Sequence, residues 1–427
     1  MKNKDRGFTL VELLAVIVIL AVILVIAVPK VSEVINSSKK ASFESSAKTI
    51  AAQAEKKKME KEILEDTGSI NCSDVVKLND TDYGNCSISF DGNTAKVTLV
   101  GKGKFKGLKI TNGTKDNSKA EEIKAPVYGN AVNYVNGLYA YNASSNGLER
   151  DTTIDNNIRY VGANPNNYVE FNGEAWRIIG IFNGNVKLVR DDFLTTYSFD
   201  NKTTAQGIET DYGTNDWTKS YLRIFLNDYY FSGKTITCHS EASGSVATNA
   251  TITCPDINKI SSSAKNMIEK TTWNLGGTGW KVASAPYETY TINELYQKER
   301  GTQVYSEHAT ISSDYIGLIY PSDYGYASTD ASCRQNLRAG LTYANSAYSG
   351  TPTCQNNNWL YKSGIWYWTM TSSSSHSNAI YNINNDGSLY SSYALTRYSV
   401  RPSLYLKQDV KVVGGTGTSS DPYTLEI

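Results

Sequence analysis

The chain of 427 residues is long enough for two to three domains, since domains commonly contain about 100 to 200 residues. Its 42 Lys and Arg residues balance 42 Asp and Glu residues, so no global field recruits nucleic acid or anionic lipid. Thirty Tyr and seven Trp beside only three His and four Met are typical of extracellular, β-rich proteins, and composition alone indicates no more.

The N-terminal segment combines a long apolar run with one carboxylate. Residues 13–28 are all apolar, and counting from Phe8 the segment has about twenty-one residues, the length of a helix that spans a bilayer core. Glu12 lies near its start, where a carboxylate in hydrocarbon costs on the order of 3 kcal/mol. Either Glu12 lies shallow and reaches the headgroups, or the chain is cut after Gly7 and Glu12 meets the free α-amino group of Phe8.

The flanks of this segment indicate its orientation. The leader at residues 1–7 carries three basic side chains and one acidic side chain, so the positive-inside bias keeps it in the cytoplasm. No clear A-x-A site follows the apolar run, which disfavours an ordinary secretory signal. Apolar spacing resumes beyond Pro29, which favours a kinked helix that continues to about residue 66.

The stretch KDRGFTLVELLAVIVILAVILVIAVP resembles the N-terminus of type IV pilins and of the pilin-like subunits of secretion and competence systems. It combines the basic leader, a small residue before the cut, the GFTLVE box, the apolar helix and Pro29. The resemblance implies that a prepilin peptidase cuts between Gly7 and Phe8 and that the new N-terminal Phe8 is N-methylated. It also implies that Glu12 of one subunit pairs with the Phe8 amine of a neighbour in a filament.

A small sheet and a linker are predicted after the helix. Residues 67–112 contain short alternating runs around a turn at Asp91 and Gly92. This layout is similar to pilins, in which a sheet covers half of the long helix. Residues 113–125 are polar and charged, which is typical of a linker.

Three lysines alternate along the end of that predicted sheet. Lys102, Lys104 and Lys106 would place three ammonium groups on one strand face. We expect them to protect a sheet edge against pairing, with binding of a phosphate backbone as the less favoured interpretation.

Six cysteines form three pairs that are close in sequence. The pairs are Cys72 with Cys86, Cys238 with Cys254, and Cys333 with Cys354. Loops of about thirteen to twenty residues suit disulfides, each contributing roughly 3 kcal/mol in the chain-entropy account. A zinc site is the weaker interpretation because no C-x-x-C occurs and only His239 lies beside a cysteine. Disulfides indicate an oxidising compartment.

The large region at residues 126–427 is predicted to be mostly antiparallel. Asn-Gly at 172–173 and 183–184 and Asp-Gly at 386–387 mark hairpin turns. The stretch NDWTKSYLRIFLNDYYF has helical apolar spacing, and a short helix is expected near residues 261–270. Large rings tend to be buried, so five tryptophans are expected in the core: Trp176, Trp273, Trp359, Trp366 and Trp368.

This region also resembles a domain found repeatedly in surface proteins of Firmicutes, on the stretches NPNNYVEFNGEAWRIIG, IGLIYPSDY, WYWTMTSS and VRPSLYLKQDVKV. Its Trp-rich strand, Asp-Gly turn and SVRPSLYL are similar to the end of domains with a C-type-lectin-like or sulfatase-modifying-factor-like fold. The resemblance implies twisted antiparallel strands and long loops, used for display and binding. The tyrosine-containing loops at residues 320–350 and 370–400 are the first places where we expect a ligand.

The sequence contains few groups that suggest catalysis. His239, His308 and His376 lie in separate segments, and no G-x-S-x-G, H-E-x-x-H, P-loop or G-x-G-x-x-G motif occurs. NINNDG at 382–387 imitates the start of a calcium loop, but Tyr393 cannot supply its bidentate carboxylate. The sugar-ligand motifs of C-type lectins are absent as well. We assign no catalytic residue, metal or cofactor and expect that the protein is not an enzyme.

The expected fold class is therefore α+β, with a long pilin helix packed on a small antiparallel sheet and a large mixed, C-type-lectin-like domain after it. The expected segments are a leader at 1–7, a helix at 8–66 with a transmembrane part at 8–28, a sheet at 67–112, a linker at 113–125 and a surface-display domain at 126–427.

We expect a type IV pilus subunit, major or minor, that displays its large domain for adhesion. Gly7, Phe8, Glu12 and Pro29 are its expected processing and assembly residues. The expected partners are other pilin subunits, prepilin peptidase, the pilus assembly machinery, the membrane before assembly, and a host surface or a carbohydrate; nucleic acid is not expected. The precursor would lie in the cytoplasmic membrane and the assembled subunit outside the cell. The alternatives are a pseudopilin of a DNA-uptake or type II secretion system, an enzyme on a pilus-like anchor, and a plain membrane anchor.

Overall fold

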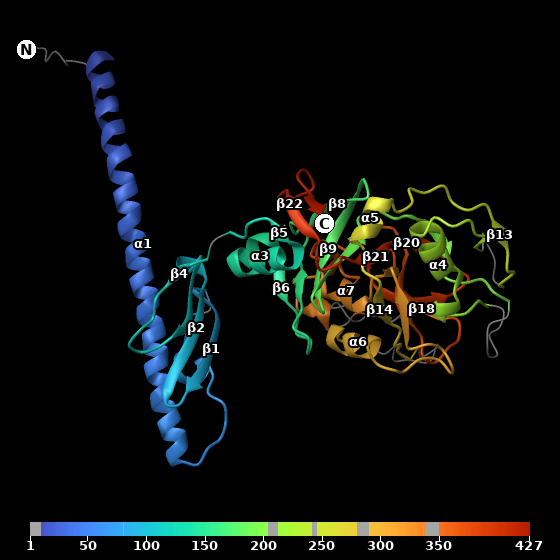
Figure 1. Cartoon of the computed structure of the whole chain (residues 1–427), viewed down its shortest axis with the longest axis horizontal. Helices are drawn as coiled ribbons and strands as arrows, with labels where there is room; N and C mark the ends of the chain where they lie inside the picture. The colour runs from blue at the N-terminus through green and yellow to red at the C-terminus, as the bar shows by residue number, and fades with distance from the viewer. Residues whose placement is uncertain are drawn as a thin grey trace, which may run out of the picture. The chain divides into compact units, whose positions relative to one another are not determined.

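The computed structural model describes residues 10–79, 81–123, 125–203, 212–240, 246–279, 290–335, 337 and 350–427, without the side chains of residues 10–30, 32 and 33. The chain divides into two compact units, Met1–Lys124 and Ala125–Ile427 (Figure 1). Each unit combines helices with mostly antiparallel strands, so the protein belongs to the mixed α+β class.

The first unit contains one long helix and a small sheet (Figure 1). Helix α1, Leu10–Ile63, runs through Pro29, as the apolar spacing beyond this proline predicts. A short helix α2, Cys72–Val75, follows. The antiparallel sheet has the order β1-β2-β3-β4. Its strands are β1 (Tyr83–Asp91), β2 (Thr94–Gly101), β3 (Leu108–Gly113) and β4 (Glu121–Glu122), with the 3-10 turn η1 (Gly103–Phe105) between β2 and β3.

Part of the predicted linker belongs to this sheet. Strand β4 pairs with β3 through Lys109 and Glu121, and Ser118 is buried. The polar composition of residues 113–125 concealed this because a two-residue edge strand needs few apolar side chains.

The lysine stripe predicted at 102, 104 and 106 is wrong. Gly103–Phe105 form a turn in place of a strand, and Gly103 has a φ of 45°, which favours glycine. A strand-like alternation of side chains is therefore lost. Lys104 pairs instead with Asp82, with 3.0 Å between Nζ and Oδ2.

The second unit is built around two larger sheets. In the described residues, a ten-stranded sheet has the order β16-β21-β10-β9-β8-β23-β22-β5, with β6 paired to β7 and β7 to β9. Its strands are β5 (Gly129–Asn130), β6 (Leu148–Arg150), β7 (Ile158–Tyr160), β8 (Tyr168–Phe171), β9 (Glu174–Phe182), β10 (Asn185–Arg190), β16 (Ile316–Leu318), β21 (Pro402–Tyr405), β22 (Lys411–Gly414) and β23 (Tyr423–Glu426).

A five-stranded sheet has the order β11-β20-β17-β18-β19. Its strands are β11 (Thr195–Ser198), β17 (Tyr367–Ser372), β18 (Ala379–Ile383), β19 (Leu389–Tyr393) and β20 (Arg397–Val400). Two ribbons complete the strands, β12 (Cys238–His239) with β13 (Thr251–Ile252) and β14 (Thr271–Asn274) with β15 (Ile311–Asp314). Parallel pairing occurs between β17 and β20 and between β8 and β23.

Short helices cover these sheets (Figure 1). They are α3 (Ala131–Asn146), η3 (Trp217–Lys219), α4 (Tyr221–Ile224), η4 (Phe225–Phe231), α5 (Ser262–Met267), α6 (Ile292–Glu299), α7 (Pro321–Tyr326), η5 (Ser332–Arg334) and α8 (Pro352–Asn356). The region around residue 220 that was predicted to be helical consists of the η3 turn and, after a break, α4, which continues directly into η4. Ser220 causes the break because it caps α4, accepting a hydrogen bond from the Arg223 amide after the η3 turn.

Both faces of the central strands are buried in this unit. In β9, Ile178 belongs to one hydrophobic cluster and Ile179 to another, and in β10 Leu188 and Val189 divide in the same way. Strands that are buried on two faces have continuous apolar runs, which explains the sequence WRIIGIF.

The predicted turns and most of the predicted core are confirmed. Asn172, Gly173, Asn183 and Gly184 all have positive φ angles between 49° and 78°, as tight hairpins require. Four of the five tryptophans are buried, whereas Trp366 is partly exposed.

The structure contains the three disulfides that the cysteine spacing predicts. They join Cys72 to Cys86, Cys238 to Cys254, and Cys333 to Cys354, with Cα atoms 6.1, 5.2 and 5.5 Å apart. Each closes a loop within one unit, so the disulfides stabilise local segments.

Candidate functional site

Helix α1 buries one stripe against the small sheet. Five side chains at helical spacing are fully buried, and they are Phe43, Ala47, Ile50, Ala51 and Ala54. They pack on inward-facing side chains of β2 and β3, including Val97 and Ile110. The small alanines permit close approach of the strands, and this packing fixes the C-terminal half of α1 on the sheet.

A buried carboxylate adds a polar connection between the same elements. Glu55 of α1 accepts a hydrogen bond from the Ala95 amide of β2, and its other oxygen lies 2.8 Å from Nζ of Lys115. The hydrogen bond from Lys115 lowers the pKa of Glu55 below its ordinary value. Glu55 therefore stays charged while it orients the sheet on the helix.

The part of α1 before Phe43 exposes apolar side chains. Val31, Val34 and Ile35 are 55 %, 68 % and 49 % exposed. Apolar side chains at successive helical turns are normally buried against another element. This portion of the helix is therefore suited to contact a partner.

The predicted processing residues fall at the edge of what is described. Gly7 and Phe8 lie outside the described residues, as do the side chains of Glu12 and Pro29, whose backbones belong to α1. None of the side chains of the predicted transmembrane segment at 8–28 is among those that the structure describes. Within the described part of the chain, no helix is sufficiently long and apolar to cross a membrane.

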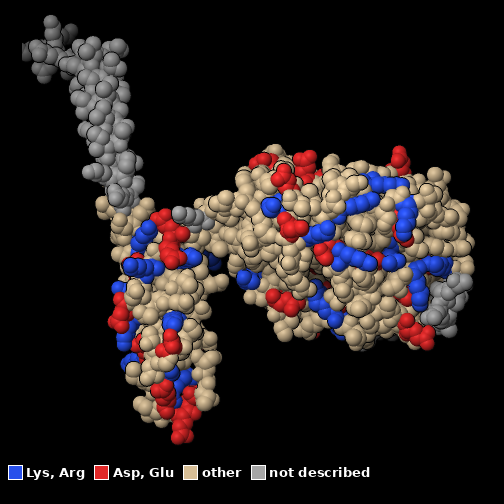
Figure 2. Space-filling view, viewed as in Figure 1, with Lys and Arg blue, Asp and Glu red and all other residues tan. Residues whose placement is uncertain are grey.

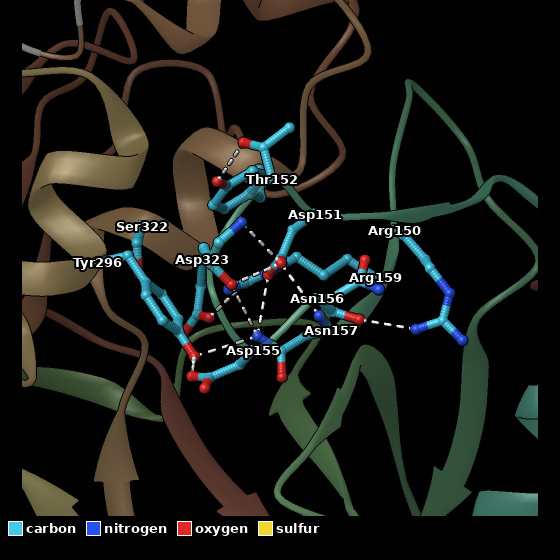
Figure 3. A network of polar contacts seen from close by, with 12 residues as sticks. Arg150, Asp151, Thr152, Asp155, Asn156, Asn157, Arg159, Tyr296, Ser322 and Asp323 are labelled. Carbon is cyan, nitrogen blue, oxygen red and sulfur yellow. Dashed lines mark hydrogen bonds and ion pairs between the residues drawn. The ribbon is translucent and has the colours of Figure 1, made fainter. Parts of the chain in front are cut away.

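The second unit contains a buried network of ion pairs (Figure 3). Arg159 of β7 lies between two carboxylates, with 2.6 Å from Nε to Oδ2 of Asp151 and 2.9 Å from Nη1 to Oδ1 of Asp323. Lys187 of β10 approaches Asp323 from another side, with 2.6 Å between Nζ and Oδ2. All four side chains are almost completely buried, so each charge depends on its partners.

The surroundings of this network determine how Asp323 titrates. Burial by itself would raise the pKa of Asp323, but Lys187 and Arg159 lower it to about 2. Asp323 also accepts a hydrogen bond from the Tyr320 amide at the start of α7. Asp323 is consequently an ionised connection between β7, β10 and α7.

Glu299 is a second buried carboxylate close to α7. Its two oxygens accept hydrogen bonds from the amide and the hydroxyl of Ser322, at 2.9 and 2.5 Å. Burial raises the pKa of Glu299 to about 7, although Arg300 opposes this shift. The carboxyl of Glu299 therefore gains a proton near neutral pH.

A polar hollow of about 300 Å³ lies beside the network. Arg150, Asp155 and Asn157 are among its lining residues, and Tyr296 joins two of them by donating to Asp155 and contacting the Asn157 amide. These side chains can donate and accept hydrogen bonds. The hollow accordingly has a polar lining.

Sequence reasoning did not find this network. Its four members are separated by up to 172 residues, from Asp151 to Asp323, and each is unremarkable alone. The available signal was the charge inside the apolar run NVKLVR, because a lysine in a buried strand requires a partner.

The three histidines are placed in different surroundings. His239 stacks on Tyr221, His308 lines a small cavity with Asp216, and His376 lies 3.1 Å from the Ser375 hydroxyl. Among the described residues, no group of three or more His, Cys, Asp or Glu side chains could hold a metal ion.

Charge is dispersed over the face of the molecule that Figure 2 shows. Basic and acidic side chains are interspersed on the first unit, and wide uncharged areas cover the second unit. This distribution agrees with the formal net charge of zero.

Residues 2–28 match the prokaryotic N-terminal methylation motif. The methylation motif includes the proposed cleavage residues Gly7 and Phe8 as well as Glu12. It implies processing by a prepilin peptidase, membrane insertion, and later assembly into pilus-like polymers at the surface or outside the cell. It is consistent with a type IV pilin-like or pseudopilin subunit. No curated protein and no solved structure matches the chain.

Proposed function

We propose that this protein is a type IV pilus filament subunit that presents its second unit for adhesion to a surface. The methylation motif at residues 2–28 carries this proposal, because it covers the beginning of the long helix α1. The exposed apolar side chains Val31, Val34 and Ile35 support it, since packing of helices in a filament would cover them.

Adhesion is the proposed role of the second unit. This unit follows the helix and sheet as a separate compact body, and the buried carboxylates Asp151, Asp323 and Glu299 are all engaged by other residues. We propose binding in place of catalysis, and a C-type-lectin-like fold remains part of the proposal, supported by the mixed antiparallel sheets. An experimental structure of the full chain would test that fold.

The N-terminus of the mature protein provides the decisive test. Material sheared from the cell surface is digested, and its N-terminal peptide is analysed by mass spectrometry. We expect a peptide that begins at N-methylated Phe8. An intact Met1, or a start beyond Pro29, would contradict the proposal and leave an anchored or secreted binding protein.

Glu12 distinguishes a filament from a plain membrane anchor. We expect Glu12→Ala to abolish sheared filaments while the precursor still accumulates in the membrane, because the neighbouring Phe8 amine would lose its partner. Glu60→Ala, an exposed carboxylate on the same helix, is the matched control and should leave filaments intact. Normal filament yield from Glu12→Ala would argue for the anchor.

A further inference from the structure

A cluster of aromatic rings lies on one face of the five-stranded sheet. Trp366 stacks on Tyr398 of β20, with ring centroids 5.4 Å apart and planes at 16°. Tyr390 of the edge strand β19 meets Trp366 edge-on, with centroids 6.3 Å apart and planes at 86°. We call Trp366, Tyr390 and Tyr398 the aromatic platform.

Strand register places Tyr390 and Trp368 on the same side of the sheet, and ring contacts connect the platform to them. Tyr390 lies opposite Asn382 of β18, and Asn382 lies opposite Trp368 of β17. Trp368 contacts Tyr398 with centroids 4.8 Å apart, which connects the platform to the core. Side chains alternate along strands, so the neighbouring Tyr367, Tyr381 and Leu389 enter the other face and its hydrophobic cluster.

The platform is open to solvent at its outer end. Tyr390 is 39 % exposed, and Trp366 and Tyr398 are partly exposed, whereas Trp368 is fully buried. Rings with two rotatable side-chain bonds, carried on paired strands, lose little conformational entropy when they bind a ligand. The platform is therefore a rigid apolar surface.

Polar groups adjoin the rings on this same face. The Ser392 hydroxyl lies 3.0 Å from the Tyr398 hydroxyl and donates to Oδ1 of Asn382 at 3.1 Å. Asn382 is fully buried, and its Nδ2 has no hydrogen-bond partner in the described structure. Unpaired buried donors are unusual, and this one belongs to the same amide that accepts the hydrogen bond from Ser392.

Charge is nearly absent from these strands. Among the residues of β17, β18, β19 and β20, Arg397 alone is charged. Arg397 precedes Tyr398 in its strand, so it points to the other side, where Nε donates to the Thr196 hydroxyl at 2.9 Å. The platform thus offers no ion pair to an anionic lipid, phosphate or acidic glycan.

We propose that the aromatic platform, with Ser392 and Asn382 beside it, binds a sugar ring of a neutral glycan. A sugar has a face of C–H groups that packs on the negative faces of aromatic rings, and hydroxyls at its edge that exchange hydrogen bonds with Ser392 and Tyr398. An apolar peptide would use the rings but would offer no further hydrogen bonds to these two hydroxyls. This proposal rests on the proposed adhesive function, to which it adds the ligand class and the residues.

Binding is tested on the full chain purified in detergent. The probes are the neutral sugars lactose, N-acetyllactosamine and chitotriose and an array of neutral mammalian glycans, with sialyllactose and a heparin hexasaccharide as anionic comparisons. Saturation-transfer NMR and tryptophan fluorescence report binding. We expect at least one neutral glycan to bind, and Trp366→Ala and Tyr390→Ala each to weaken its affinity by roughly tenfold or more.

Two variants are matched controls. Tyr390→Phe keeps the ring and should retain binding, and Tyr141→Ala removes a tyrosine of similar exposure, 38 %, from helix α3 and should have no effect. If Trp366→Ala fails to fold, the affinity of Tyr390→Ala, a variant at the sheet edge, decides whether the platform binds the glycan.

Three results would overturn the proposal: no neutral glycan binds, an anionic glycan binds more tightly, or affinity survives both alanine variants. None of them changes the N-terminal peptide of sheared filaments. Failure of the glycan site is therefore distinguishable from failure of the filament function.

Discussion

At the scale of single residues, Glu299 makes the stability of the second unit depend on pH. The folded protein holds the proton of this buried carboxyl with a pKa of about 7, compared with an ordinary value of 4.5. Between these values the folded state binds more protons than the unfolded chain, so the free energy of unfolding should fall as pH rises from about 4.5 to 7. The loss attributable to Glu299 is on the order of 3 kcal/mol.

The matching substitutions are Glu299→Gln, which cannot titrate, and Glu294→Gln, an exposed change on the same helix. Urea unfolding is measured at several pH values across this range. The free energy of unfolding should fall less steeply with pH for Glu299→Gln than for the parent protein or for Glu294→Gln. Equal slopes in all three proteins would show that Glu299 does not bind its proton as expected.

Asp323 acts in the opposite direction at lower pH. Its folded pKa of about 2 lies below the ordinary value of 3.8, so its contribution is complete above the ordinary value and is lost as pH falls toward 2. The stabilising contributions of these two carboxyls are therefore both present in weakly acidic solution.

The partners of the individual buried charges could not be predicted from the sequence. The partners of Arg159 and Lys187 come from residues 151 and 323, and no local pattern connects positions so far apart. The exposure of Trp366 was mispredicted for a related reason. Its alternation with aliphatic residues matches a core strand, but Trp366 lies just before β17, where the sheet face opens to solvent.

At the scale of elements, local signals were more informative. Asn-Gly pairs predicted the hairpins at 172–173 and 183–184 because only residues that tolerate positive φ form such turns. The helix around residue 220 was predicted as one piece because apolar spacing does not reveal a cap in mid-segment. The edge strand β4 was missed because its two residues are both glutamates.

The contact between α1 and the small sheet depends strongly on Phe43. This ring is fully buried, and its centroid lies 5.2 Å from the centroid of the Phe105 ring. Phe43→Ala should destabilise the first unit by about 3 to 5 kcal/mol, because it removes buried surface and leaves a cavity. Chemical denaturation, followed by circular dichroism, measures this change.

Met59→Ala provides the comparison on the same helix. Met59 is 52 % exposed, so its loss should change the free energy of unfolding by less than about 0.5 kcal/mol. If Phe43→Ala were as mild as Met59→Ala, the helix would not depend on the sheet in the way that its burial indicates.

At the scale of the whole molecule, the division into two units predicts where a protease cuts first. The boundary lies at residues 124–125, and Val127 just beyond it is 87 % exposed. Exposed, weakly packed connections are preferred cleavage sites. Limited digestion with a protease of broad specificity should release a fragment that begins between residues 123 and 129.

This fragment should keep its own cooperative thermal transition, because its hydrophobic clusters lie within residues 125–427. Mass spectrometry and calorimetry measure these two outcomes. Early cleavage in β8, β9 or β10, or a fragment without a transition, would contradict independent folding of the second unit.

The position of β5 has a mechanical consequence. The chain enters the second unit at β5, which pairs with β22 alone, and β22 separates β5 from the final strand β23. Force applied to a ligand of the second unit would therefore be transmitted along the chain through β5. Strand β5 has two residues, secured by the Ala131 amide donating to the Val410 carbonyl at 2.8 Å and by Asn130 donating to Gln408.

The disulfides do not bypass this route, since each closes a loop within its own unit. Under load, β5 would separate from β22 before the central strands separate, because only two residue pairs join β5 to β22. The released segment could lengthen the connection while the proposed ligand-binding face stays folded, which would make the attachment extensible under force.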